Sequence, residues 1–157
     1  MSSTVLGRAL HEGVLDSLDH PVERFIKVSG TGYGGATLRH VLMMSSGVSF
    51  FHHQGSPDRA EMYRQIWGHG RDLDDFAGEL GTQVPSRTDF NYLATDTHVL
   101  SMVLRALYDQ PFHQIVQEQL WDVIGMSGDA FWSQHAPGDS GHAFGHACLC
   151  PRLLEFA

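Results

Sequence analysis

Lysine, cysteine and long hydrophobic runs are scarce in this sequence. Lys27 is its single lysine, and no apolar run approaches the ~20 residues that a membrane-spanning helix requires. The opening segment, MSSTVLGRALHEG, has no basic leader, and Arg8 interrupts its apolar stretch, so it does not match a secretory signal. We therefore expect no membrane partner and a cytoplasmic location for the chain as written; the location is unknown if the natural N-terminus lies upstream of Met1.

Basic residues are also few. Lys and Arg together number 10 against 18 Asp and Glu, which gives a formal net charge of −8. Because the basic residues are scattered singly, they form no stripe that could neutralise a nucleic-acid backbone. The hydrophobic share of 42% is typical of a folded globular protein. The composition therefore predicts one folded unit that does not bind nucleic acid.

The two cysteines lie close together near the C-terminal end. Cys148 and Cys150 are separated by one residue, which is too tight for an easy disulfide. His142 and His146 precede them, and thiolate and imidazole groups are ligands that zinc accepts. The spacing differs from that of common zinc modules, which place paired ligands on two separate knuckles. We therefore expect free thiols and loop histidines, with no metal bound, and keep a zinc site in this tail as the alternative.

Other short motifs give weaker signals. His52 and His53 are adjacent, so their side chains point in different directions on any regular element, and we expect a solvated loop there. The glycine-rich GTGYGG at 30–35 follows no apolar strand, which argues against a nucleotide-binding turn. No G-x-S-x-G is present. A Ser-x-x-Lys is also absent, because Arg24 stands three positions before Lys27.

Apolar residues recur at helical spacing along much of the chain. Thr37 and Ser56 precede two such segments and offer hydroxyl oxygens to the amides of the first turn. Val14 on the first segment and Val123 on the last are among the residues expected to face inward. The segments predicted as helices are 2–15, which Gly13 is expected to end, 38–46, 56–68, 71–80, 95–107 and 111–125, with a short strand at 130–132.

A tyrosine stands where polar turn residues give way to one of these helices. The segment FNYLATDTHVLSMVLRAL places Tyr92 just before the helix expected from about Thr95. The ordinary interpretation is a packing aromatic whose hydroxyl reaches the surface. A phenol titrates near 10 and is seldom a base without a nearby cation. The residues alone therefore favour a packing role.

Five blocks of the sequence together resemble the middle of a serine β-lactamase-related hydrolase. They are, in order, GVLDSLDHPVERFI, GTGYGGATLRHVLMMSSGV, FNYLATDTHVLSMVLRAL, LWDVIGMSGDAFWS and AFGHACLCPRLLEFA. Within that superfamily the likeness is greatest to 6-aminohexanoate-dimer hydrolases and their esterase relatives. The resemblance implies a mainly α chain, namely the helical region of the β-lactamase-like α/β fold without most of its antiparallel sheet.

The same resemblance implies a role for Tyr92. In such hydrolases three elements meet in one cleft: a Ser-x-x-Lys, a Tyr-x-Asn or Tyr-x-Ser, and a Lys/His-x-Gly strand near the C-terminus. The serine attacks the acyl carbon, while the lysine and the tyrosine exchange the proton. Tyr92 falls on the second element and would be the proton-transfer residue. The third position of that element is Ala94, so its usual polar side chain is replaced by a methyl group.

The resemblance covers only one of the three elements. The stretch SSTVLGRALHEGVLD is similar to the nucleophile helix just after the Ser-x-x-Lys turn, and the chain stops before the C-terminal strand. Residues 1–157 are therefore expected to be a partial β-lactamase-related domain that contains no nucleophile and is inactive alone. The complete hydrolase would cleave small amide or ester substrates through an acyl-serine intermediate, with no metal or organic cofactor.

A non-catalytic protein is the alternative from a different class. It would be a truncated remnant, or a module that only binds. In either case the missing sheet should leave apolar side chains in water, at a cost of about 1.5 to 3 kcal/mol each. We therefore expect marginal stability and self-association through exposed apolar surface. The side chains expected to lose partners are Leu6, Leu10, Val41, Leu42 and Phe156.

Overall fold

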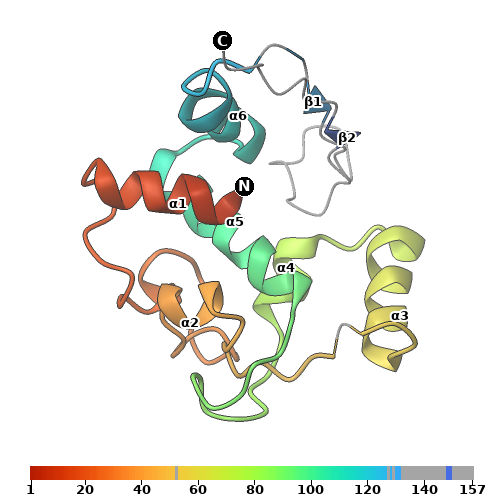
Figure 1. Cartoon of the computed structure of the whole chain (residues 1–157). Coiled ribbons are helices and arrows are strands. Elements are labelled where there is room, and N and C mark those ends of the chain that lie inside the picture. Colours follow the sequence, from red (N-terminus) through yellow and green to blue (C-terminus); the bar gives the residue numbers. More distant parts are fainter. Residues whose placement is uncertain (52, 127, 129, 132–147, 150–157) are drawn as a thin grey trace.

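Helix α5 (Ala94–Tyr108) crosses the centre of the structure, and most of the other helices pack against it (Figure 1). The computed structural model describes residues 1–51, 53–126, 128, 130–131 and 148–149. The helices in contact with α5 are α1 (Ser2–His11), α2 (Leu38–Leu42), α4 (Leu73–Gly78) and α6 (Phe112–Val116). The remaining elements are α3 (Pro57–Tyr63), the 3₁₀ turn η1 (Val22–Arg24), the π-helical turns η2 (Arg64–Gly68) and η3 (Gln117–Trp121), and the strands β1 (Ala130–Phe131) and β2 (Cys148–Leu149).

The described part of the chain is therefore mainly helical, as the sequence predicted. Its strands are the two-residue antiparallel pair β1–β2, in which Ala130 faces Leu149. The strand predicted at 130–132 is confirmed for Ala130 and Phe131, while Trp132 lies outside the described residues. Among the described residues, no helix has the length and apolar character needed to cross a membrane.

The helix starts follow the predicted caps. The Thr37 hydroxyl accepts from the His40 amide, and the His40 ring is bonded to the Thr37 amide, so α2 begins with a reciprocal capping box. The Ser56 hydroxyl accepts from the Arg59 amide at the start of α3, with Pro57 in the first helical position. Both caps are confirmed, because each satisfies amides that have no partner inside the helix.

The apolar core corrects two expectations about α1 and α2. Leu6 and Val41 are fully buried in the same core as Val103 of α5, so the expectation that lost partners would leave these two side chains in water is wrong. Leu42 is partly buried against that core. By contrast Leu10 is exposed, which fits the expectation for that side chain. Phe156 lies outside the described residues.

Two valines expected to face inward are exposed. Val14 falls beyond the end of α1, where Gly13 adopts φ +75°, so it no longer follows the helical face. Val123 is 53% exposed. It follows the π-helical turn η3, and the wider turn rotates every later position relative to an α-helical register. The helix predicted over 111–125 is therefore shorter and less regular than its apolar spacing suggests.

A close backbone approach joins two loops near the start of α5. Gly47 has φ +81°, and a Cβ added to it would lie 2.2 Å from the carbonyl oxygen of Val84. Its own carbonyl accepts from the amide of Gln83 at 2.9 Å, and Val48 forms a β-bridge with Thr82. Glycine is required here both for the left-handed backbone and for the space.

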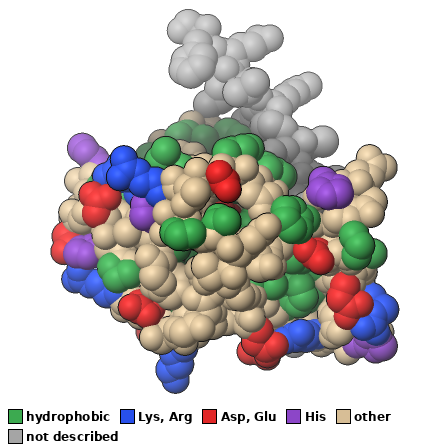
Figure 2. Space-filling model, turned by 90° about the horizontal axis from the view of Figure 1, so that it is seen from below, with side chains coloured by type: hydrophobic (Ala, Val, Ile, Leu, Met, Phe, Trp, Pro, Cys, Tyr) green, Lys and Arg blue, Asp and Glu red, His purple; other side chains and the backbone are tan. Residues whose placement is uncertain are grey.

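On the face seen in Figure 2, hydrophobic side chains lie among uncharged surface, while acidic and basic side chains lie mostly towards the rim. Exposed apolar side chains at the described surface include Met43, Trp67 and Phe90. Self-association through such side chains stays a prediction.

Candidate functional site

Tyr92 lies at the entrance to α5. The next residue, Leu93, is the N-cap of the helix and is fully buried, whereas the side chain of Tyr92 is 64% exposed. On the other side, the Asn91 amide donates to the Met44 carbonyl at 2.8 Å, and Asn91 Nδ2 donates to the Phe50 carbonyl at 2.9 Å. The backbone of Tyr92 is therefore held on both sides, while its phenol reaches the solvent.

A small pocket adjoins this segment. Its volume is about 160 Å³, similar to a cavity of roughly 150 Å³ that holds a benzene molecule. Two loops form its walls: Gly47, Val48 and Phe51 on one side, and Gln83, Val84, Asp89, Phe90 and Asn91 on the other. Phe51 and Phe90 are exposed, and Asp89 contributes the charged group of the lining. The pocket can receive one short group beside Phe90 and Asn91, the two residues before Tyr92.

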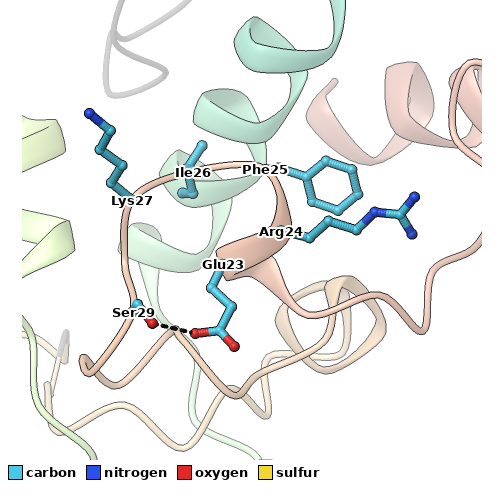
Figure 3. Close-up of a pocket in the computed structure, with 6 residues that line it drawn as sticks. All are labelled: Glu23, Arg24, Phe25, Ile26, Lys27 and Ser29. Atoms are coloured by element: carbon cyan, nitrogen blue, oxygen red, sulfur yellow. Dashed lines mark hydrogen bonds between the residues drawn. The ribbon is translucent and has the colours of Figure 1, made fainter.

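A larger hollow of about 440 Å³ surrounds the turn at 23–29 (Figure 3). Ser29 Oγ donates to a Glu23 carboxylate oxygen at 2.8 Å. The side chains of Arg24 and Lys27 point away from each other, so the two cations do not converge on one ligand. Lys27 lines this hollow and not the pocket beside Tyr92. Lys27, the single lysine of the chain, therefore lies at a different site from Tyr92, the predicted proton-transfer residue.

A buried hydrogen-bonded cluster lies in the first turn of α5. The Tyr33 hydroxyl donates to Asp96 Oδ1 at 2.8 Å, and Ser46 Oγ donates to the same oxygen at 2.9 Å. The Tyr33 hydroxyl is also hydrogen-bonded to Thr95 Oγ1 at 3.0 Å. Asp96 Oδ2 is buried, and no hydrogen-bond partner for it is found within the described residues. Three distant segments of the chain thus meet at one carboxyl group.

Burial controls the ionisation of this cluster. It raises the pKa of Asp96 from 3.8 to about 7, against the opposing effect of the hydrogen bonds from Tyr33 and Ser46. Burial, together with the negative charge of Asp96, also raises the pKa of the Tyr33 phenol well above its usual value. The carboxyl of Asp96 is therefore the strongly perturbed acidic group at the start of α5, four residues after Tyr92.

The sequence placed Tyr92 just before a helix, as the structure has it, but it did not predict this cluster. Asp96 stands three and seven positions before Val99 and Val103, which places it on the buried face of α5, and that spacing was visible in the sequence. Tyr33 lies inside the GTGYGG loop, whose glycines were considered only as a possible nucleotide-binding turn. The catalytic role of Tyr92 stays a prediction. Ala94 is the first residue of α5, and its methyl group offers no hydrogen bond.

The predicted metal alternative falls mostly outside the described residues. His142, His146 and Cys150 are not described, and for Cys148 only the backbone in β2 is. His53 is exposed in a loop, as expected for a solvated histidine, and its neighbour His52 is not described. In the ranges that the structure does describe, no group of three or more His, Cys, Asp or Glu is placed to hold a metal ion.

We expect purified protein to carry far less than one equivalent of zinc, because the ligand spacing of the tail does not match a structural site. The check is metal analysis of the purified chain, with thermal unfolding measured before and after a chelator. A stoichiometric zinc whose removal lowers the melting temperature would reverse this expectation, since structural zinc contributes folding free energy directly.

Comparison with known proteins gives one match along the sequence and several in structure. The sequence model of the Beta-lactamase family matches residues 1–148. No curated protein sequence is significantly similar to the chain. Among solved structures, a provisionally assigned 6-aminohexanoate-dimer hydrolase from Bacillus anthracis is 20% identical with a TM-score of 0.72, over 85% of this chain and 38% of its own length.

Two further structures show the same partial likeness. A penicillin-binding protein from Bacillus halodurans is 20% identical with a TM-score of 0.69, over 84% of this chain and 40% of its own. A D-stereospecific amidohydrolase from a Streptomyces species is 19% identical with a TM-score of 0.63, over 90% of this chain and 50% of its own. These identities establish a shared fold, and the chain spans half or less of the length of these three proteins.

Proposed function

Since this chain belongs to the beta-lactamase family, we propose that it is the helical part of a serine hydrolase that cleaves amide or ester bonds in small acyl compounds. The observation that carries the proposal is the placement of Tyr92: its backbone is anchored on both sides, its phenol is exposed, and the two residues before it, Phe90 and Asn91, line a small pocket. A group that accepts and returns a proton must reach the substrate from a fixed position.

The proposed reaction proceeds in two stages. A serine hydroxyl attacks the acyl carbon, and its proton passes through a lysine and the Tyr92 phenol to the leaving amine or alcohol. Water then attacks the acyl-serine ester and releases the acid. A neighbouring ammonium would favour the phenolate form of a tyrosine. Lys27 does not line the pocket beside Tyr92, so we assign the lysine, like the serine, to a Ser-x-x-Lys element that this sequence does not contain.

The domain proposal follows from the same comparison. We propose that residues 1–157 form a partial domain, which begins just after the Ser-x-x-Lys element and ends before the C-terminal Lys/His-x-Gly strand. The chain covers 38% of the similar Bacillus anthracis protein, which fits such a part. Without the attacking serine, only weak binding and polarisation effects would remain, so the chain by itself is proposed to be inactive. The substrate pocket would be completed by the absent strand.

The test uses the longest in-frame product that the coding DNA upstream of Met1 allows. If that product carries a Ser-x-x-Lys, we expect it to hydrolyse p-nitrophenyl acetate, and Tyr92→Phe should lower kcat/KM at least about a hundredfold, because proton transfer is lost. Tyr63→Phe is the matched control, since Tyr63 lies on α3 and should leave the rate unchanged.

Two results would contradict the proposal. The first is a Tyr92→Phe rate equal to that of the Tyr63→Phe control, which would leave Tyr92 with a packing role only. The second is an acyl-enzyme detected by mass spectrometry on a serine of the 157-residue chain alone. That chain is expected to hydrolyse p-nitrophenyl acetate no faster than its own Tyr92→Phe variant does. A stop codon directly upstream, with no Ser-x-x-Lys, would favour the non-catalytic alternative, which the alanine at position 94 also supports.

A further inference from the structure

We propose that Asp96 is the positioning residue of Tyr92, acting through a closed ring of contacts that joins its side chain and its backbone amide to the backbone on the two sides of the tyrosine. The inference rests on the proposed function of Tyr92, which it deepens by naming what holds the phenol in place. Asp96 itself is fully buried and acts through its neighbours.

One half of the ring runs along the start of α5. The Asp96 amide donates to the carbonyl oxygen of Leu93 at 3.2 Å, which fixes the residue immediately after Tyr92. Leu93 is fully buried and has an extended backbone, with φ −124° and ψ 122°. A displacement of the Asp96 backbone therefore moves Leu93, the residue that follows Tyr92.

The other half runs through the turn at 43–47. Ser46 Oγ donates to Asp96 Oδ1 at 2.9 Å. Two residues earlier in the same turn, the Met44 carbonyl accepts from the Asn91 amide at 2.8 Å, which fixes the residue immediately before Tyr92. Met44 has φ +53°, a conformation uncommon for a residue with a side chain, so this turn is held in shape by its surroundings. The ring closes because Asn91, Tyr92 and Leu93 are consecutive.

A further contact braces the ring from the outside. Tyr33 comes from the loop before α2, and its fully buried hydroxyl donates to the same Asp96 oxygen. The groups that face the carboxyl are thus Tyr33, Ser46 and the adjacent Thr95, and no ion pair with a basic side chain is found for Asp96 in the described part of the chain. A buried carboxyl is costly, and an apolar side chain at this position of α5 would pack without that cost. A carboxyl at this position is explained if its hydrogen bonds fix the turn at 43–47 against the start of α5.

The experiment measures the position of Tyr92 in the chain as it exists. The chain has four tyrosines, and labelling them with ¹³C at the ring Cζ gives separate resonances that single Tyr→Phe changes assign. In the unchanged chain, the Tyr92 resonance should show an inflection near pH 7, where the carboxyl of Asp96, with a pKa of about 7, changes charge. Tyr63, on α3, should show no such inflection.

Two variants and one control separate positioning from a nearby charge. Ser46→Ala breaks the ring but keeps the Asp96 carboxyl, and it should displace the Tyr92 resonance at pH 5. Asp96→Asn keeps an oxygen that can accept from Ser46 but does not ionise, so it should abolish the inflection near pH 7. Ser45→Ala is the matched control, because Ser45 is also buried but its hydroxyl donates to the His40 carbonyl, outside the ring. It should leave the Tyr92 resonance in place. Far-UV circular dichroism confirms that each variant is folded.

The proposal is overturned if the Tyr92 resonance is flat from pH 5 to pH 8.5 in the unchanged chain. It is also overturned if Ser46→Ala moves that resonance no more than Ser45→Ala does. The result is independent of hydrolysis: a Tyr92 that follows Asp96, combined with an unaffected rate in Tyr92→Phe, would reject the proposed function and leave the positional link intact.

Discussion

Stability of the chain is expected to fall as the pH rises from about 4 to about 7, by roughly 4 kcal/mol in total from Asp96 alone. The pKa of this buried carboxyl is raised from 3.8 to about 7 in the folded protein. Between those two values the folded state holds a proton that the unfolded state has released. The contribution of Asp96 is therefore fully present below pH 3.8 and is lost as the pH passes through 7. Urea unfolding at half-unit steps of pH measures the slope.

Asp96→Asn is expected to remove most of that slope, because the amide does not ionise while its oxygen can still accept from Tyr33 and Ser46. At pH 8 the variant should be more stable than the unchanged chain, since no charge is then buried. Asp89→Asn is the control: it removes an exposed carboxyl of the adjacent loop and should leave the slope unchanged. A slope that persists in Asp96→Asn would show that other groups cause it.

Replacing Gly47 with alanine is expected to destabilise the fold by at least about 2 to 3 kcal/mol, the sum of a strained backbone and a broken hydrogen bond. The left-handed backbone costs a residue with a side chain about 1 to 2 kcal/mol. The new methyl group would lie 2.2 Å from the Val84 carbonyl oxygen, so the two loops must separate. Separation also breaks the bond from the Gln83 amide to the Gly47 carbonyl, at roughly 1 kcal/mol. Native domains hold only ~5 to 15 kcal/mol, so a loss of this size is a large part of the total.

Gly55→Ala is the matched control for this change. Gly55 has φ +86°, close to that of Gly47, but a Cβ added there meets nothing within 4 Å. It should therefore cost only the backbone strain, about 1 to 2 kcal/mol. Equal destabilisation of the two variants would mean that the close approach of the loops contributes little. The readout is the free energy of unfolding from urea titration, with far-UV circular dichroism as the probe.

Local signals in the sequence predicted the helices well. Thr37 and Ser56 cap α2 and α3 at the positions that the change from polar to apolar residues predicted. Such a cap can be predicted because it depends on residues only three positions apart. The resemblance to β-lactamase-related hydrolases is confirmed by the match over residues 1–148, and with it the helical part of that fold. The π-helical turn at 117–121 left no recognisable trace in the apolar spacing, and Val123 was misplaced as a result.

The surroundings of Tyr92 could not be predicted in the same way. Asn91 is held by Met44 and Phe50, which lie far along the chain, and no local pattern reports such contacts. The burial of Asp96 could have been predicted, because an acidic residue at helical spacing from Val99 and Val103 lies on the same buried face of the helix. Its partners Tyr33 and Ser46 became evident only in three dimensions.

The central position of α5 also sets how the molecule opens. Because α1, α2, α4 and α6 all pack on this helix, it cannot separate from one of them without weakening the others, and its amides should exchange with solvent only when the whole fold opens. Helix α3 is tied to the core chiefly through Met62, with Ile66 of η2 beside it, so this pair of elements should open at a lower free energy than α5. Sequence change can therefore accumulate in α3 with little consequence for Tyr92, whereas α5 transmits each change it undergoes to the entire core.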